Sequence, residues 1–182
     1  QCPHSVVDFL VTFYKDNPEM HTPGAQGVKA NVDKKIKEST DLYVNMNDAK
    51  VQMAGFAEYE AHLSNAMQSY MDKYPDVMKQ NPFGLVESFN LQYYPIGGGF
   101  KSDHHERSGE LDKTIKRMLV FMTYLNDVPD GGTNFKYFDH KETAVKGKTL
   151  IWPSDWTHTH SGEISNTQEK MIATGWFSFI WD

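Results

Sequence analysis

Two histidine-bearing stretches carry the residues that could do chemistry in this chain. The first, from Tyr93 to Glu106, reads YYPIGGGFKSDHHE, and the second, from Trp156 to Lys170, reads WTHTHSGEISNTQEK. Residues two apart on a β-strand point to the same face, so His104 and Glu106 could present an imidazole and a carboxylate to one interior point. A second imidazole from the distant stretch would complete the two-histidine, one-carboxylate set that is typical of non-haem Fe(II) sites.

The second stretch offers two histidines for the remaining ligand position, His158 and His160. On a regular strand they would share a face, so His158 could also lie near the site. We select His160, because Ser161-Gly162 follows it and Lys170 opens the apolar run KMIATGWFSF ten residues later. A buried lysine needs an anion to offset its desolvation, and a co-substrate carboxylate beside the metal would supply one.

Several motifs follow one another over roughly the last hundred residues. They are Y-P-x-G-G-G-F-K-x-x-H-x-E, R-M-L-V-F-M-T-Y-L-N-D, G-G-T-N-F, and H-x-G with a lysine ten residues after the histidine. This set resembles the prolyl-4-hydroxylase-like family of Fe(II)/2-oxoglutarate dioxygenases. The order of the motifs makes the resemblance more specific than any one of them alone.

The resemblance implies a set of metal ligands. In that family the metal is held by His-x-Asp/Glu and a distal histidine, which correspond here to His104, Glu106 and His160. The correspondence also decides against Asp103 and His105, a rival pair with the same spacing that would face the opposite side of a strand. Glu stands where Asp is commoner. Because an acid is present, hydroxylation is the implied outcome.

The resemblance also implies a 2-oxoglutarate site. A basic residue nine or ten positions past the distal histidine pairs the far carboxylate of 2-oxoglutarate, and this position corresponds to Lys170. Two tyrosines that often contribute to the same pocket correspond to Tyr94 and Tyr124. Lys in place of the commoner Arg would offer a point charge instead of a planar fork.

The activity implied by the resemblance is hydroxylation of an unactivated C–H bond. The cofactors would be Fe(II) and 2-oxoglutarate, with dioxygen as co-substrate and with release of succinate and CO2, and the substrate would be a proline in a peptide or protein. One alternative is the same chemistry on a small molecule or free amino acid. Others are a metal enzyme that does not use 2-oxoglutarate and a non-catalytic jelly-roll binding module with a structural ion. A structural ion has no need of the buried cation expected at Lys170.

Length, charge and cysteine content narrow the class of protein. At 182 residues the chain is expected to form a single domain. Its net charge of −6 disfavours an extended nucleic-acid surface. The single cysteine, Cys2, cannot form an internal disulfide, and there is neither a signal-peptide pattern nor a long apolar run. We therefore expect a soluble protein in a reducing, cytoplasmic compartment, without a membrane partner; the sequence is silent on oligomeric state.

Residues 1–80 are expected to be mainly helical. Apolar residues at helical spacing follow Ser5, a candidate N-cap, and the run ends at Asn17-Pro18. Residues 21–41 are polar and are expected to form a loop with a short strand at its end. A second apolar stripe at steps of three and four predicts a long helix that ends before Pro75; it comprises Phe56, Tyr59, Leu63, Met67, Tyr70, Met71 and Tyr74.

From residue 84 onward the pattern favours strands. Runs rich in β-branched and aromatic residues occupy 85–95, 117–128, 148–153 and 170–181, and Asp130 to Thr133 is expected to form a turn before a strand near Phe135. Helices followed by strands indicate an α+β, mainly β fold. With the metal motif, the specific prediction is a double-stranded β-helix, or jelly roll, over 84–182, supported by the N-terminal helices. Trp176 is expected either in its core or in the wall of the pocket, and Arg117 in a structural role or at the substrate rim.

Overall fold

Antiparallel strands dominate the described part of the chain, which comprises residues 1–25, 31–108 and 112–180 of a computed structural model. The helices are α1 (His4–Asp16), α2 (Ala49–Ala54), α3 (Ala57–Lys73) and α4 (Asp112–Lys116), with short 3-10 helices η1 (Pro18–Met20), η2 (Pro75–Lys79) and η3 (Trp156–His158). The strands are β1 (His21–Pro23), β2 (Lys37–Glu38), β3 (Thr40–Val44), β4 (Phe83–Gly84), β5 (Phe89–Tyr94), β6 (Gly99–Phe100), β7 (Arg117–Tyr124), β8 (Val128–Phe135), β9 (His140–Ala144), β10 (Thr149–Pro153), β11 (His160–Gly162) and β12 (Lys170–Phe179).

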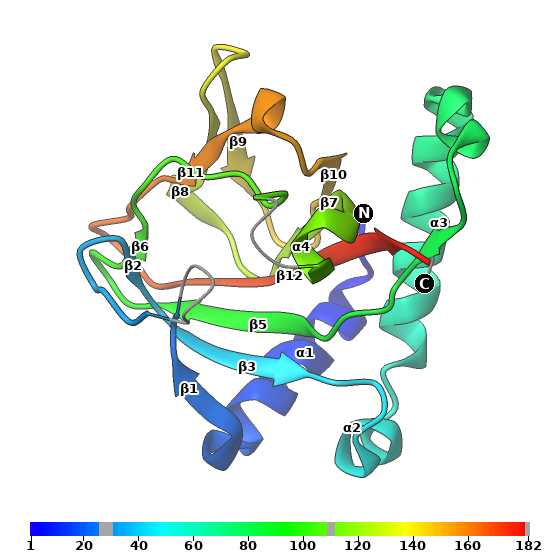
Figure 1. Ribbon diagram of the computed structural model, residues 1–182. Helices are drawn as coiled ribbons and strands as arrows, with labels where there is room; N and C mark the ends of the chain where they lie inside the picture. The colour runs from blue at the N-terminus through cyan, green and yellow to red at the C-terminus, as the bar shows by residue number, and fades with distance from the viewer. Residues whose placement is uncertain (26–30, 109–111, 181–182) are drawn as a thin grey trace.

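The strands form a large sheet and a small sheet that face each other (Figure 1). The large sheet has the order β1-β3-β5-β12-β7-β10, with β4 also paired to β12, and the small sheet has the order β11-β8-β9. A separate ladder joins β2 to β6. Two opposed antiparallel sheets with helices on one side confirm the predicted double-stranded β-helix.

Alternation along the central strands separates two cores. On β7, Leu119 and Phe121 face the helices, whereas Val120 and Met122 face the small sheet. Residues two apart on a strand share a face, so one strand can serve both cores. The helices α1 and α3 lie on the side of the large sheet away from β8 and β11 (Figure 1). The site is therefore backed by a rigid, apolar layer.

The two predicted N-terminal helices are confirmed, with one wrong detail. The helix α1 ends where Asn17 was expected to end it, but Ser5 is not the N-cap, because the helix begins at His4 and no side chain caps it. In α3 the predicted stripe is buried at Tyr59, Leu63 and Met67. Its last member, Tyr74, lies outside the helix and is exposed.

The N-terminal third contains more strand than the sequence suggested. The expected loop over 21–41 holds β1, β2 and the start of β3, while residues 26–30 lie outside the described part. These strands are two to five residues long, and the small number of apolar residues in them explains why alternation did not reveal them. Through β3 and β1, the N-terminal third extends the large sheet.

Two expectations about the second half need correction. The expected turn over 130–133 lies within β8, whose pairing with β9 shifts register between Val128 and Thr133. The strand expected to run to residue 181 ends as β12 at Phe179, and residues 181–182 lie outside the described part.

In the ranges that the structure describes, no helix has both the length and the apolar character needed to span a membrane.

Candidate metal and co-substrate site

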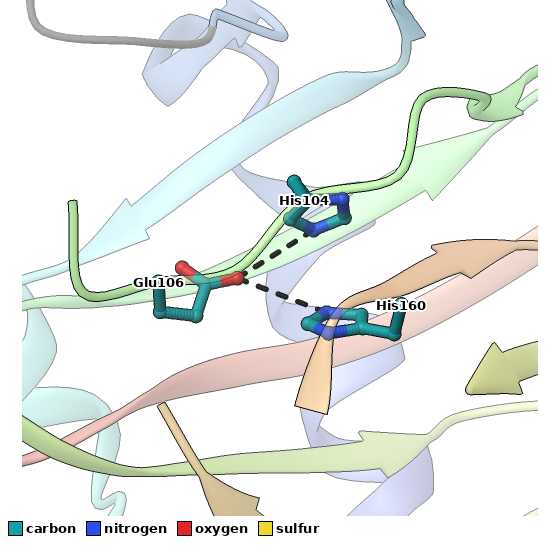
Figure 2. Close-up of side chains that lie close together, drawn as sticks. All are labelled: His104, Glu106 and His160. Carbon is teal, nitrogen blue, oxygen red and sulfur yellow. Dashed lines mark ion pairs between the residues drawn. The ribbon is translucent and has the colours of Figure 1, made fainter. Parts of the chain in front are cut away.

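Three side chains converge between the two sheets: His104, Glu106 and His160. One ligand atom from each lies within 4.8 Å of the other two. Figure 2 shows that one oxygen of Glu106, Oε1, faces both rings, at 3.5 Å from Nε2 of His104 and 3.8 Å from Nε2 of His160. The arrangement presents two imidazole nitrogens and one carboxylate oxygen to a common point.

The backbone positions these side chains through an isolated antiparallel bridge. His104 and His160 each donate a backbone N–H to the other's carbonyl oxygen, both at 2.9 Å. The regular strand expected over 104–106 is absent, and Glu106 follows in a bend whose N–H donates to the carbonyl of Ser154 at 3.1 Å. The two-residue spacing thus brings the imidazole and the carboxylate together, but anchored backbone contacts and not strand alternation hold them there.

Hydrogen bonds to carbonyls orient both rings. Nδ1 of His104 lies 3.0 Å from the carbonyl oxygen of Ser102, and Nδ1 of His160 lies 2.9 Å from that of His158. A carbonyl only accepts, so Nδ1 carries the proton and Nε2 keeps its lone pair. Each imidazole is thereby held with its free nitrogen directed at the cluster, as metal-binding histidines usually are.

The electrostatics of the cluster favour a neutral His104 ring beside an ionised Glu106. Burial, reinforced by the neighbouring His160, lowers the pKa of His104 to about 4. Burial alone would raise the pKa of Glu106, but the two histidines and Arg117 outweigh it and hold that pKa below its usual value. Near neutral pH the site therefore offers the protonation states that a divalent cation needs.

The second oxygen of Glu106 is held by residues that the sequence did not connect to it. Nε1 of Trp176 donates to Oε2 at 3.0 Å, and Nη1 of Arg117 lies 3.6 Å from the same oxygen. The guanidinium stacks on the Trp176 ring at 3.4 Å and donates to Glu87 at 2.9 Å. Trp176 thus lines the site while packing against the apolar core between the sheets, and Arg117 supports the carboxylate. Glu87 was missed, and no motif marked it.

The rival candidates are not members of the cluster. Asp103 is exposed and pairs with Lys136 at 3.0 Å, and His105 is also exposed. His158 is in η3 rather than on a strand with His160, and its ring packs against Phe138, with 4.8 Å between ring centroids. Its carbonyl nevertheless orients His160, so His158 contributes its backbone but not its side chain.

Lys170 is buried at the start of β12. Its Nζ donates to the carbonyl oxygens of Gly131 at 2.7 Å and Glu163 at 2.9 Å, and in the described residues no carboxylate oxygen lies within ion-pair distance. Burial lowers the pKa of this ammonium to about 8. A buried cation held only by neutral carbonyls is prepared to receive an anion.

The two tyrosines named from the resemblance lie close to this lysine. Nζ of Lys170 is 5.4 Å from the centre of the Tyr94 ring, and Tyr124 hydrogen-bonds Thr133 at 2.6 Å. The Tyr94 hydroxyl donates to Gln92 at 2.6 Å. Burial raises the pKa of both phenols, which keeps them neutral. Each can therefore act as a hydrogen-bond donor after a change of partner.

One cavity of about 700 Å³ joins these elements. It is lined by both histidines and the carboxylate of the cluster, by Lys170 and by the two tyrosines. The volume lies within the range of small-molecule sites. An octahedral ion such as Fe(II) fits the donor set, because three protein ligands leave positions open toward this cavity.

Comparison with known proteins supports the same assignment. Residues 89–178, which include all three members of the cluster and Lys170, match the model of the 2OG-Fe(II) oxygenase superfamily. No curated protein sequence matches the chain significantly.

Solved structures with a similar fold include prolyl hydroxylases of low sequence identity. A Pseudomonas putida prolyl-4-hydroxylase is 17% identical, with a TM-score of 0.67 over 98% of this chain and 89% of that one. A Trichoplax adhaerens prolyl hydroxylase, in complex with a hypoxia inducible factor peptide fragment, is 13% identical, with a TM-score of 0.69 over 95% and 76%. A viral collagen prolyl hydroxylase from Paramecium Bursaria Chlorella virus-1, in complex with 2OG, is 17% identical, with a TM-score of 0.64 over 98% and 92%.

Proposed function

Because the chain belongs to the 2OG-Fe(II) oxygenase superfamily, we propose that it is an Fe(II)- and 2-oxoglutarate-dependent hydroxylase of a proline in a peptide or protein. The observation that carries the proposal is that the His104, Glu106 and His160 cluster and the buried Lys170 open onto one cavity, and that Lys170 pairs with no carboxylate of the described residues. A set of metal-ligand side chains, with a lysine nearby that is held only by carbonyl oxygens, suits a co-substrate that chelates at one end and carries a carboxylate at the other.

The proposed roles follow from the contacts. His104, Glu106 and His160 would hold Fe(II) through Nε2, Oε1 and Nε2. Lys170 would bind the far carboxylate of 2-oxoglutarate, exchanging a carbonyl for a charged acceptor. Tyr94 lies beside Lys170 and would donate its hydroxyl to the same region of the pocket.

The chain would position the cofactors and the substrate and limit the entry of water, and the cofactors would oxidise the substrate. Bound Fe(II), together with 2-oxoglutarate and dioxygen, would provide the oxidising power that converts C–H to C–OH with release of succinate and CO2. Tyr124 and Thr133 satisfy each other's hydroxyls at the lysine end of the cavity, and Val120 and Met122 make one wall apolar. These walls limit the entry of water around the reacting groups.

The choice of a prolyl peptide as substrate draws on the similar structures. The Trichoplax adhaerens enzyme, a prolyl hydroxylase, is bound to a peptide fragment, and two other neighbours are prolyl hydroxylases by name. The same chemistry on a small molecule or a free amino acid is the alternative that the experiment must separate.

The direct test is an anaerobic titration of 2-oxoglutarate into the Fe(II)-loaded protein, followed by the visible charge-transfer absorbance of the chelate. Wild type should give a saturable band, and Lys170→Ala should need at least about tenfold more 2-oxoglutarate because a charge-assisted hydrogen bond is lost. Absence of the band in folded, iron-loaded wild type would refute the dioxygenase assignment in favour of a binding module.

The substrate is tested separately by aerobic succinate formation with proline-containing peptides and with free L-proline, followed by mass spectrometry of the peptide. A mass increase of one oxygen on proline supports the proposal. Stimulation by L-proline alone would move the function to a free amino acid.

A further inference from the structure

We infer that Asn90 binds the backbone of the substrate peptide, through a backbone N–H next to the target proline, at the end of the cavity remote from Lys170. The inference rests on the proposed prolyl hydroxylase function and names a residue that recognises its substrate.

The register of the large sheet places Asn90 away from the co-substrate. Tyr94 pairs with Lys170, and Asn90 pairs with Thr174, four residues further along β12. At about 3.3 Å per residue this separation is roughly 13 Å along the strands. Asn90, Gln92 and Tyr94 alternate onto the cavity side of β5, so one strand runs along the cavity from the lysine end to the far end.

The end of the cavity near Asn90 is also the end at which the carboxylate of Glu106 is held. Trp176, two residues beyond Thr174 on the same face of β12, donates to Glu106. A ligand group next to Asn90 would therefore lie on the Glu106 side of the metal. That is the part of the cavity left to a substrate once 2-oxoglutarate occupies the Lys170 end.

Asn90 carries a buried hydrogen-bond acceptor without a partner. The residue is 5% exposed, and its Oδ1 makes no hydrogen bond with any part of the chain that the structure describes. The neighbouring polar side chains that line the cavity do have hydrogen-bond partners. Gln92 accepts from Tyr94 and donates to Asp41, and Thr174 donates to the carbonyl of Phe121. Buried polar atoms are almost always paired, so an unpaired one that lines a cavity indicates a ligand.

Among the cavity-lining residues of the described ranges, one other side chain has a buried polar atom without a partner, the indole of Trp152. That ring packs against His160, with 5.0 Å between ring centroids, and so belongs to the metal end. Its N–H is a donor, whereas Oδ1 of Asn90 is an acceptor.

The missing partner of Oδ1 must bring a donor. Fully ionised 2-oxoglutarate has only acceptors, so the co-substrate cannot fill this role. Proline within a chain also lacks an N–H, but the residues on either side of it carry one each. A neutral amide acceptor suits a neutral backbone N–H, which a peptide supplies and an isolated proline does not.

The test combines a variant with an altered peptide. Amidated decapeptides, each with one central proline, are screened for stimulation of succinate formation by wild type. The best peptide is then made in two ester forms, in which oxygen replaces the N–H before or after the proline. Wild type and Asn90→Leu, a substitution of similar shape without the acceptor, are compared on all three.

For wild type, one of the two esters should raise the KM by about tenfold, the value of one hydrogen bond. Asn90→Leu should show that same increase with the normal peptide and no further increase with the ester. Its charge-transfer titration with 2-oxoglutarate should match that of wild type. If Leu overfills the site, Asn90→Ala provides the same comparison.

The outcomes separate the two levels of the proposal. If peptides stimulate wild type but the ester penalties are equal in wild type and variant, the role of Asn90 is refuted and the prolyl hydroxylase function stands. If no peptide stimulates wild type while L-proline does, the peptide substrate is wrong and the role of Asn90 with it.

Discussion

Nε1 of Trp176 donates a hydrogen bond to Oε2 of Glu106 at 3.0 Å, across seventy positions of sequence. Because this oxygen is occupied, Oε1 alone faces the two histidine rings. The pair therefore fixes which oxygen is available to a metal. Outer contacts of this kind commonly tune metal affinity.

We expect Trp176→Phe to weaken metal binding while keeping an aromatic ring in place. Removal of the indole N–H frees Oε2 to rotate, and the loss in Co²⁺ or Mn²⁺ affinity should be about 10- to 100-fold. Anaerobic calorimetry measures it, with Trp156→Phe at an exposed position as the control. Equal affinities for the two variants would show that the hydrogen bond does not orient the ligand.

Glu106→Asp should lose metal affinity although the ligand type is unchanged. The shorter side chain cannot both face the histidines and accept from Trp176 at 3.0 Å. We expect a loss of about tenfold or more, and near-complete loss for Glu106→Ala. The same calorimetry compares the two; wild-type affinity in Glu106→Asp would mean that the longer arm is not required.

His160→Ala should abolish metal binding, whereas His158→Ala should leave it largely intact. The structure explains the difference, since His158 contributes only its carbonyl, which alanine retains. Metal content after dialysis against Fe(II) or Co²⁺ reports the result. The reverse pattern would assign the third ligand to His158.

The affinity for 2-oxoglutarate should fall as pH rises through about 8. Burial lowers the pKa of Lys170 to about 8, and only the ammonium form pairs with a carboxylate. Above that pH the loss should approach about tenfold per unit. The charge-transfer titration between pH 6.5 and 9 tests this, with Lys170→Arg, which stays charged, expected to show a flatter profile.

The same pKa shift predicts a rise in stability with pH. The unfolded chain, with the lysine at its ordinary pKa near 10.5, binds more protons than the folded protein between about pH 8 and 10.5. The free energy of unfolding contributed by Lys170 therefore increases across this window. Urea unfolding of wild type and Lys170→Met should diverge at pH 8 and converge by pH 10.5; a constant difference would contradict the shift.

A buried ion pair outside the candidate metal site should contribute to the free energy of unfolding. Nζ of Lys37 lies 2.6 Å from Asp41, and their side chains are 7% and 1% exposed. Asp41→Ala would leave a buried ammonium unpaired and should lower the free energy of unfolding by about 3–5 kcal/mol. Asp76→Ala, at an exposed pair with Lys79, should change it by less than about 1 kcal/mol. Urea denaturation compares the two.

Local pattern accounts for much of the fold. The spacing of Tyr59, Leu63 and Met67 follows from the helical repeat, and the alternation in β7 and β12 follows from the strand repeat, because both depend only on near neighbours in sequence. The short strands β1 and β2 were not predicted, because two or three mostly polar residues are too few to show an alternating apolar pattern. Their place in a ladder is decided by the strand beside them.

For the site, the residue types were predictable from the motifs alone: two histidines, an acid and a lysine in a recognisable order. Tertiary structure decided which side chains converge. The 3-10 helix η3 turns the His158 ring away from His160, and a bridge between His104 and His160 replaces the expected strand. Contacts between residues far apart in sequence, such as Trp176 with Glu106, depend on how the sheet closes, so local spacing cannot encode them. That Oδ1 of Asn90 has no partner among the described residues likewise depends on how the strands pack around it.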